Sequence, residues 1–136
     1  MTKEFHLSDD KLWDKIFEAF EDKGGVYKLI CKEDNKIKSV GRFLNTDLNG
    51  VLYIGKANSY LDRVIGLKKT IDPEMKSEPH ICGRRYNKNK RIGKQFPYKN
   101  LFIELIGDSN PEQKEKEELD KYFEEFGEVP PLNANG

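Results

Sequence analysis

Residues 24–31 form an apolar run, Gly-Gly-Val-Tyr-Lys-Leu-Ile-Cys, that is interrupted only by Lys28 and predicts a strand. Successive side chains of a strand point to opposite faces, so Tyr27 and Leu29 would share one face. A second apolar run covers residues 51–54 and ends at Gly55, and a third covers residues 101–106. These runs predict a small, mostly antiparallel three-stranded sheet, with another short strand possible within residues 37–44.

The period changes after the second run, where apolar residues recur at helical spacing. Asn58 or Ser59 can cap this helix at its start. Its expected apolar face consists of Tyr60, Leu61, Val64, Ile65 and Leu67.

Two further helices are expected at the ends of the chain. The segment Leu7–Asp10 is expected to begin a helix that stops at Gly24-Gly25, so residues 1–23 would form a helical extension packed on the sheet. Another helix should run from Pro111, in its first turn, to Phe126. The core stripes expected on these two helices are Leu12, Trp13, Ile16, Phe17 and Phe20, and Leu119, Tyr122, Phe123 and Phe126.

The whole pattern predicts an α+β fold in one domain, residues 1–136, with the order α-β-(β)-β-α-β-α. Hydrophobic residues make up 36% of the chain, and no apolar run approaches the roughly 20 residues of a membrane helix. The first residues lack the apolar core of a secretory signal. Cys31 and Cys82 alone make neither a disulfide framework nor a four-ligand zinc site, so a cytoplasmic protein without a membrane partner is expected.

The net charge is zero, with 24 basic and 24 acidic residues, which by itself argues against a general nucleic-acid binder. The distribution is uneven, however. Residues 84–99 hold seven basic residues and no acid, interleaved with Tyr86, Phe96 and Tyr98, whereas residues 112–128 hold eight acids. The basic segment is either a phosphate- and base-contacting surface or a solvated loop that balances the acidic helix. The candidate nucleic-acid-binding residues are Arg84, Arg85, Lys88, Lys90, Arg91 and Lys94.

Two tripeptides stand on the predicted strands: Gly25-Val26-Tyr27 and Tyr53-Ile54-Gly55. Arg63 follows ten residues after Tyr53, and the acidic helix leads into Pro-Pro-Leu-Asn at residues 130–133. In this order, the set resembles the GIY-YIG nuclease superfamily over residues 24–133. The two tyrosines are 26 residues apart, where many members use about half that distance, so a long connection must lie between the strands.

The resemblance implies a metal-dependent endonuclease that hydrolyses DNA phosphodiester bonds. It makes Tyr27 the candidate base or water-positioning group, Tyr53 the second active-site hydroxyl and Arg63 the phosphate clamp. Lys56 could add positive charge beside Tyr53, although it could equally be a surface lysine. Gly25 and Gly55 would provide backbone room. Several members also carry a histidine near the site. His80, in the loop after the second helix, is either the candidate for it or a solvent-exposed loop histidine.

The family closes its domain with a helix that carries a metal-binding glutamate, which would hold a single Mg²⁺ or Mn²⁺ ion. The ligand should lie in the first turns of the last helix, on the side that faces the sheet. Glu115 and Glu118 both share that side with Tyr122, whereas Glu117 points further away, and we favour Glu115 slightly.

Asn133 either ties the C-terminal segment to the strands, lies near the phosphate, or belongs to a plain turn after Pro130-Pro131. Other functions stay open at this point. The chain could be a catalytically inactive nucleic-acid-binding module that kept the fold, or a protein-interaction domain that uses the acidic helix. A monomer and a homodimer are both compatible with the sequence, and a dimer would suit an enzyme that cuts both strands.

Overall fold

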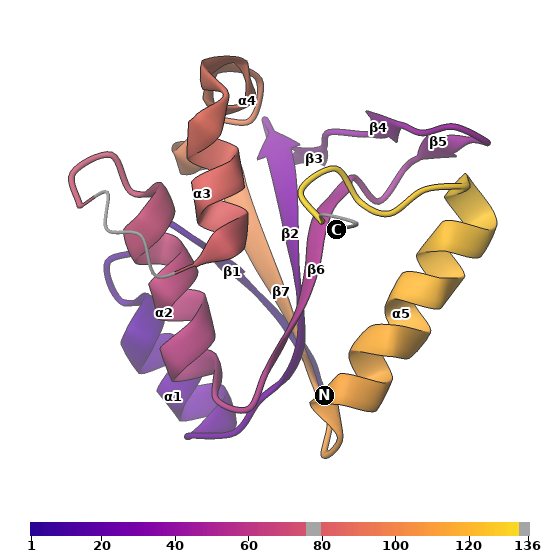
Figure 1. The fold of residues 1–136 in the computed structure, drawn as a ribbon. Helices are drawn as coiled ribbons and strands as arrows, with labels where there is room; N and C mark the ends of the chain where they lie inside the picture. Colours follow the sequence, from indigo (N-terminus) through magenta and orange to yellow (C-terminus); the bar gives the residue numbers. More distant parts are fainter. Residues whose placement is uncertain (76–79, 134–136) are drawn as a thin grey trace.

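The structure is a computed structural model that describes residues 1–75 and 80–133 of the chain. It is an α+β fold built on an antiparallel sheet (Figure 1). The elements in chain order are β1 Thr2–His6, α1 Leu12–Phe20, β2 Gly25–Glu33, β3 Lys36–Ile37, β4 Val40–Gly41, β5 Thr46–Asp47, β6 Val51–Ala57, α2 Tyr60–Ile71, α3 Ile81–Lys88, α4 Lys90–Gln95, β7 Leu101–Gly107 and α5 Pro111–Phe126, with a single 3₁₀ turn, Tyr98–Asn100, before β7.

Strand β2 lies at the centre of the sheet, between β7 on one side and β6 on the other. These three strands are the ones predicted from the apolar runs. The sheet also includes β3, which continues the hairpin from β2, and β1, which pairs with β7. The sheet therefore has more strands than the three that the sequence predicted.

The N-terminal extension is not purely helical, as the sequence had suggested. Residues Thr2–His6 form an edge strand of the sheet, and helix α1 begins only at Leu12. The Asp9 carboxylate accepts a hydrogen bond from the Lys11 backbone N–H at 2.8 Å, which forms a turn between the strand and the helix. Phe5 is the one apolar residue of this strand that faces the core. Residues 2–6 therefore show no period-2 pattern from which a strand could be predicted.

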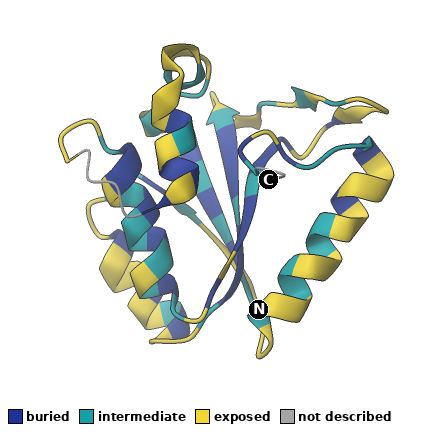
Figure 2. Ribbon diagram, viewed as in Figure 1, coloured by how far each residue is buried: buried dark blue, intermediate teal, exposed yellow. Residues whose placement is uncertain are grey.

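Helices cover both faces of the sheet. Helices α1, α2 and α3 lie on one side and α5 lies on the other, and the central strands are buried between them (Figures 1 and 2). The larger core cluster includes Tyr27, Leu29 and the buried apolar residues of α1 and α2. A smaller cluster lies under α5 and consists of Val26, Ile30, Val51, Ile54, Tyr122 and Phe126.

Some residues of the predicted apolar stripes do not lie in the core. Trp13 and Phe17 are 48% and 46% exposed and stack on each other with ring centroids 5.4 Å apart. Phe123 on α5 is 57% exposed. The remaining stripe residues on α1 and α2 are buried or half-buried against the sheet. The others stay exposed because a helix that packs on a sheet buries only a narrow face.

The basic segment after residue 80 is largely helical. It is not the solvated loop that was one of the two interpretations of its sequence. It forms α3 and α4. Tyr86 is buried, and its hydroxyl donates a hydrogen bond to the Phe96 carbonyl at 2.6 Å. Phe96 and Tyr98 also pack against the main core cluster. The interleaved aromatics therefore hold the segment on the domain.

Candidate active site

The strand register places the two motif tyrosines on the same face of the sheet. Tyr27 of β2 lies opposite Gly55 of β6, and Leu29 lies opposite Tyr53. Tyr27 and Tyr53 are therefore diagonal neighbours, with ring centroids 5.9 Å apart. They face the side covered by helices α1 to α3.

Gly55 makes this arrangement of rings possible. A Cβ atom at this position would lie 2.5 Å from Cζ of Tyr27 and 2.6 Å from Cε2 of Tyr53. Any side chain would force one of the rings away. Gly25 is restricted in a different way, because its φ is +153° and a Cβ atom would lie 2.2 Å from the Ile106 carbonyl oxygen.

His80 completes a triangle of rings with the two tyrosines. Its ring centroid is 6.0 Å from that of Tyr27 and 5.8 Å from that of Tyr53. The Nε2 atom of His80 lies 2.6 Å from the Tyr27 hydroxyl, and the Nδ1 atom accepts a hydrogen bond from the Cys82 backbone N–H at 3.1 Å. His80 is thus buried at the N-cap of α3, and it is not a solvent-exposed histidine.

Burial dominates the ionisation of this group. Together with the positive charge of Arg63, it lowers the pKa of His80 to about 4, so the imidazole is neutral at pH 7. Burial also raises the pKa of Tyr27 and of Tyr53 above the ordinary value for tyrosine. Arg63 opposes this rise at both tyrosines, because a nearby positive charge favours the phenolate.

Arg63 and Tyr53 line one cavity of about 400 Å³. Strand β6 pairs only with β2, so the cavity lies at the edge of the sheet, where residues of α2 and α5 can both reach it. Lys56 follows the glycine of the second motif and also lines it. The full lining is Tyr53, Lys56, Ala57, Asn58, Arg63, Glu112 and Glu115.

The two candidate metal ligands occupy different surroundings. Glu118 forms ion pairs with Lys28 at 2.8 Å and with Lys121 at 3.7 Å, and it does not line the cavity. Burial acts to raise its pKa, but the hydrogen bond and charge of Lys28 lower it overall. Glu115 does line the cavity, and among the described residues it has no ion-pair or hydrogen-bond partner. Burial raises its pKa, although Lys56 opposes this.

This arrangement suits a hard divalent cation such as Mg²⁺ or Mn²⁺ better than a metal that needs several His or Cys ligands. Within residues 1–75 and 80–133, no group of three or more His, Cys, Asp or Glu side chains is placed to hold a metal ion. Mg²⁺ commonly keeps several waters and is bound through one or two carboxylates together with substrate phosphates. An unpaired carboxylate that faces a cavity beside an arginine fits such an ion, and Glu112 could assist Glu115 from the preceding turn.

Sequence reasoning had not assigned Asn58 or Glu112 to the site. Glu112 lies three residues before Glu115 on α5, so helical spacing alone could have placed the two carboxylates together. Asn58 lies in the connection between β6 and α2, and nothing in its spacing pointed to the cavity.

The basic residues named from the sequence lie on α3 and α4, directly after His80. Arg85 is half-buried and donates a hydrogen bond from Nη1 to the Leu132 carbonyl at 2.8 Å, so it has a structural role. Its neighbours Arg84 and Lys88 line a shallow cavity of about 470 Å³ together with it. The other candidates are exposed: Arg84, Lys88, Lys90, Arg91 and Lys94.

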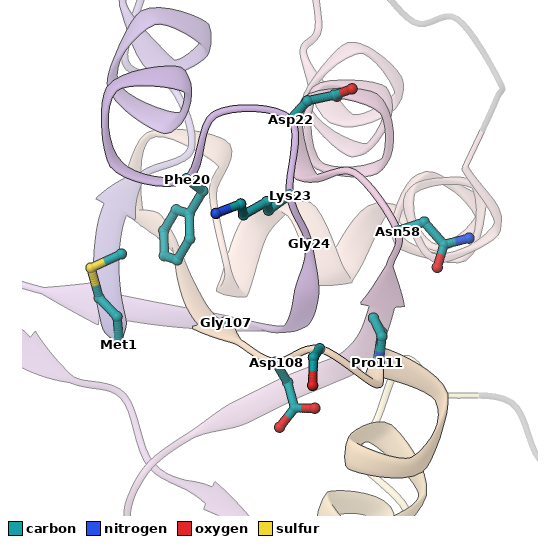
Figure 3. A pocket seen from close by; sticks show the side chains of 10 residues that line it. Met1, Phe20, Asp22, Lys23, Gly24, Asn58, Gly107, Asp108 and Pro111 are labelled. Carbon is teal, nitrogen blue, oxygen red and sulfur yellow. The ribbon is translucent and has the colours of Figure 1, made fainter.

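A larger cavity of about 710 Å³ lies beside this site, near the ends of α1 and β7 (Figure 3). It shares Asn58 with the site cavity but contains neither tyrosine nor Arg63. Its charged side chains are Asp22, Lys23 and Asp108, and its lining includes no arginine. The smaller cavity is the better phosphate site, because the planar guanidinium of Arg63 can hold two phosphate oxygens.

Comparison with known proteins adds no name to this geometry: no protein-family profile, curated protein or solved structure matches the chain. No helix among the described residues has the length and apolar character that crossing a membrane requires.

Proposed function

We propose that this protein is a metal-dependent endonuclease of the GIY-YIG type that hydrolyses DNA phosphodiester bonds. One observation carries the proposal. Tyr53, Arg63 and the unpaired Glu115 come from a strand and two helices on opposite sides of the sheet, yet they line the same cavity. The Tyr53 ring also packs against the core, but hydrolysis of a phosphodiester can use its hydroxyl, the Arg63 guanidinium and the Glu115 carboxylate.

Each residue has a role that follows from its chemistry. The planar guanidinium of Arg63 can hold two phosphate oxygens at once. Lys56 adds a second positive charge at the cavity. Glu115 would hold one Mg²⁺ or Mn²⁺ ion, which when bound would neutralise charge on the phosphate and lower the pKa of a water molecule. Tyr53 lines the cavity and can position water or a phosphate oxygen, and Tyr27 lies diagonally beside it on the same face of the sheet.

Substrate binding would extend from the cavity to the exposed cations of α3 and α4. Helix α3 begins one residue after His80, so its first turn lies next to the site. Arg84 and Lys88 project from this helix to solvent and can contact the backbone of a polynucleotide. DNA is the proposed substrate class, bound by a monomer or a homodimer.

The direct test is conversion of supercoiled plasmid to nicked or linear forms. We expect cleavage with Mg²⁺ or Mn²⁺ and none with excess EDTA. Arg63→Ala should lower the rate on the order of 100-fold, since it removes a preorganised charge from the transition state. Lys69→Ala is the matched control, because Lys69 is an exposed cation on the same helix that does not line the cavity.

Two other outcomes would replace the proposal. Salt-dependent DNA binding without cleavage under any of these metal conditions would make the chain an inactive nucleic-acid-binding module. If the protein neither binds nor cleaves DNA, the basic helices and the cavity have no nucleic-acid role.

A further inference from the structure

The two site tyrosines differ in their access to substrate. Tyr27 is fully buried, with 0% of its surface exposed, and it does not line the site cavity. Tyr53 is only partly buried and forms part of the cavity wall. Only the Tyr53 hydroxyl is thus placed to contact a bound phosphate.

The backbone of α3 determines where the His80 proton lies. The Cys82 N–H can only donate, so the Nδ1 atom that it contacts at 3.1 Å must be unprotonated. The proton of the neutral ring is then on Nε2, which lies 2.6 Å from the Tyr27 hydroxyl oxygen. His80 therefore donates a hydrogen bond to Tyr27 and cannot accept the tyrosine's proton.

The Tyr27 proton needs another acceptor, because the Tyr27 oxygen accepts from His80. The Arg63 guanidinium, whose hydrogen bond with Tyr27 acts to lower the pKa of Tyr27, can only donate and cannot take this proton. Tyr53 is the neighbour on the same face, with ring centroids 5.9 Å apart. A Tyr53 oxygen that accepts from Tyr27 has its remaining O–H free to point into the cavity.

We propose that Tyr53 is the tyrosine that contacts substrate, as a hydrogen-bond donor to a phosphoryl oxygen, and that Tyr27 and His80 are positioning residues that hold it in this direction. The inference rests on the proposed nuclease function. It reverses the roles that the sequence resemblance implies, since Tyr27 had been the expected base. The contact forms and breaks no covalent bond, and the raised pKa of both tyrosines keeps the hydroxyls protonated near neutral pH.

A double-mutant cycle with tyrosine-to-phenylalanine variants tests the order of contacts. Tyr53→Phe should lower kcat on the order of 100-fold, as the loss of one oxyanion donor does in other hydrolases, with a smaller change in KM. Tyr27→Phe should lower kcat by roughly 10-fold, because the Tyr53 hydroxyl is kept but no longer directed. The double variant should be no slower than Tyr53→Phe alone, since Tyr27 acts only through Tyr53.

The matched control is Tyr86→Phe. It also removes a buried hydroxyl hydrogen bond, but one that is made to the Phe96 carbonyl outside the cavity. Thermal unfolding is measured for every variant to verify that each one is folded. A larger kcat loss in Tyr27→Phe than in Tyr53→Phe, or losses that multiply in the double variant, would overturn the proposal.

The direction of the hydrogen bonds can be measured without any cleavage. Two-dimensional ¹H–¹⁵N NMR of histidine-labelled protein at pH 7 should show His80 with its proton on Nε2 and an unprotonated Nδ1. Finding the proton on Nδ1 would refute the proposed direction of the hydrogen bonds, from His80 to Tyr27 to Tyr53, even in an active enzyme. If the wild type cleaves no DNA but the NMR result is as expected, the proposed function and the contact of Tyr53 with a phosphoryl oxygen fail. The hydrogen bond from His80 to Tyr27 then still stands.

Discussion

The side-chain amide of Asn133 pairs with both backbone polar groups of Ile54, in the manner of a neighbouring strand. Its Oδ1 accepts from the Ile54 N–H and its Nδ2 donates to the Ile54 carbonyl, both at 2.9 Å. Ile54 follows Tyr53 directly on the edge strand β6, and the adjacent Leu132 N–H donates to the Leu52 carbonyl at 2.8 Å. The C-terminal segment thus fixes the strand that carries the site.

Asn133→Ala should destabilise the fold because it leaves two backbone groups of β6 without a partner. We expect a loss of about 1 to 3 kcal/mol in the free energy of unfolding, measured by urea titration. Asn133→Asp should also be destabilising, since a carboxylate can accept from the Ile54 N–H but repels the carbonyl oxygen. Equal stability of wild type and Asn133→Ala would show that the pairing contributes nothing.

Gly55→Ala should disturb the tyrosine pair, because the new methyl group would overlap the rings of Tyr27 and Tyr53. We expect a destabilisation of about 1 to 3 kcal/mol, as for other overpacked cores, together with loss of cleavage. Gly41→Ala is the control, since no atom lies within 4 Å of its added Cβ. Identical melting temperatures for the two variants would contradict the close approach of the rings to Gly55.

Charge reversal at Arg84 and Lys88 should weaken DNA binding and flatten its salt dependence. Each lost phosphate contact is expected to reduce the slope of log K against log salt by about 1. Arg85 is left unchanged because it holds the Leu132 carbonyl. The control reverses Lys11 and Lys36, which are exposed and belong to neither basic helix. Equal affinity and slope in the two double variants would remove α3 from the binding surface.

His80 should make stability fall on mild acidification. Its pKa in the folded protein is about 4, against an ordinary value of 6.5, so below pH 6.5 the unfolded chain binds a proton that the native state does not. Stability is complete above pH 6.5 and is lost as the pH falls toward 4, by roughly 3 kcal/mol in total. His80→Gln should lack this component, which urea titrations of both proteins between pH 7 and pH 4 will measure. Parallel pH profiles would contradict the burial of a neutral histidine.

Much of the framework could be predicted from sequence because it depends on local patterns. The central strands and the helices after residues 59 and 110 follow from period-2 and period-3.6 spacing, with Pro111 at the first turn of α5. Asn133 was correctly given a tie to the strands as one of its alternatives. The strand β1 was missed because its pairing with β7 is a long-range contact that leaves almost no apolar alternation in five residues.

The site was only partly predictable for the same reason. Motif order indicated Tyr27, Tyr53 and Arg63, but the burial of Tyr27 depends on His80 and α3, which are distant from it in sequence. Helix phase could not separate Glu115 from Glu118, because both face the sheet side of α5. The choice depends on Lys28, a strand residue that pairs with Glu118 and leaves Glu115 beside the cavity.

The most direct test of the central claim is the initial rate of plasmid cleavage by Glu115→Gln beside Glu118→Gln, at saturating Mg²⁺ and Mn²⁺. Both changes remove one carboxylate from the same face of α5 and keep the size of the side chain. We predict that Glu115→Gln abolishes cleavage and leaves DNA binding and thermal stability nearly unchanged. Glu118→Gln should keep most of the activity and lose at most about 1 kcal/mol of stability, from its partly exposed ion pair. Full activity of Glu115→Gln, or loss of activity in Glu118→Gln alone, would contradict a metal-dependent site at this cavity.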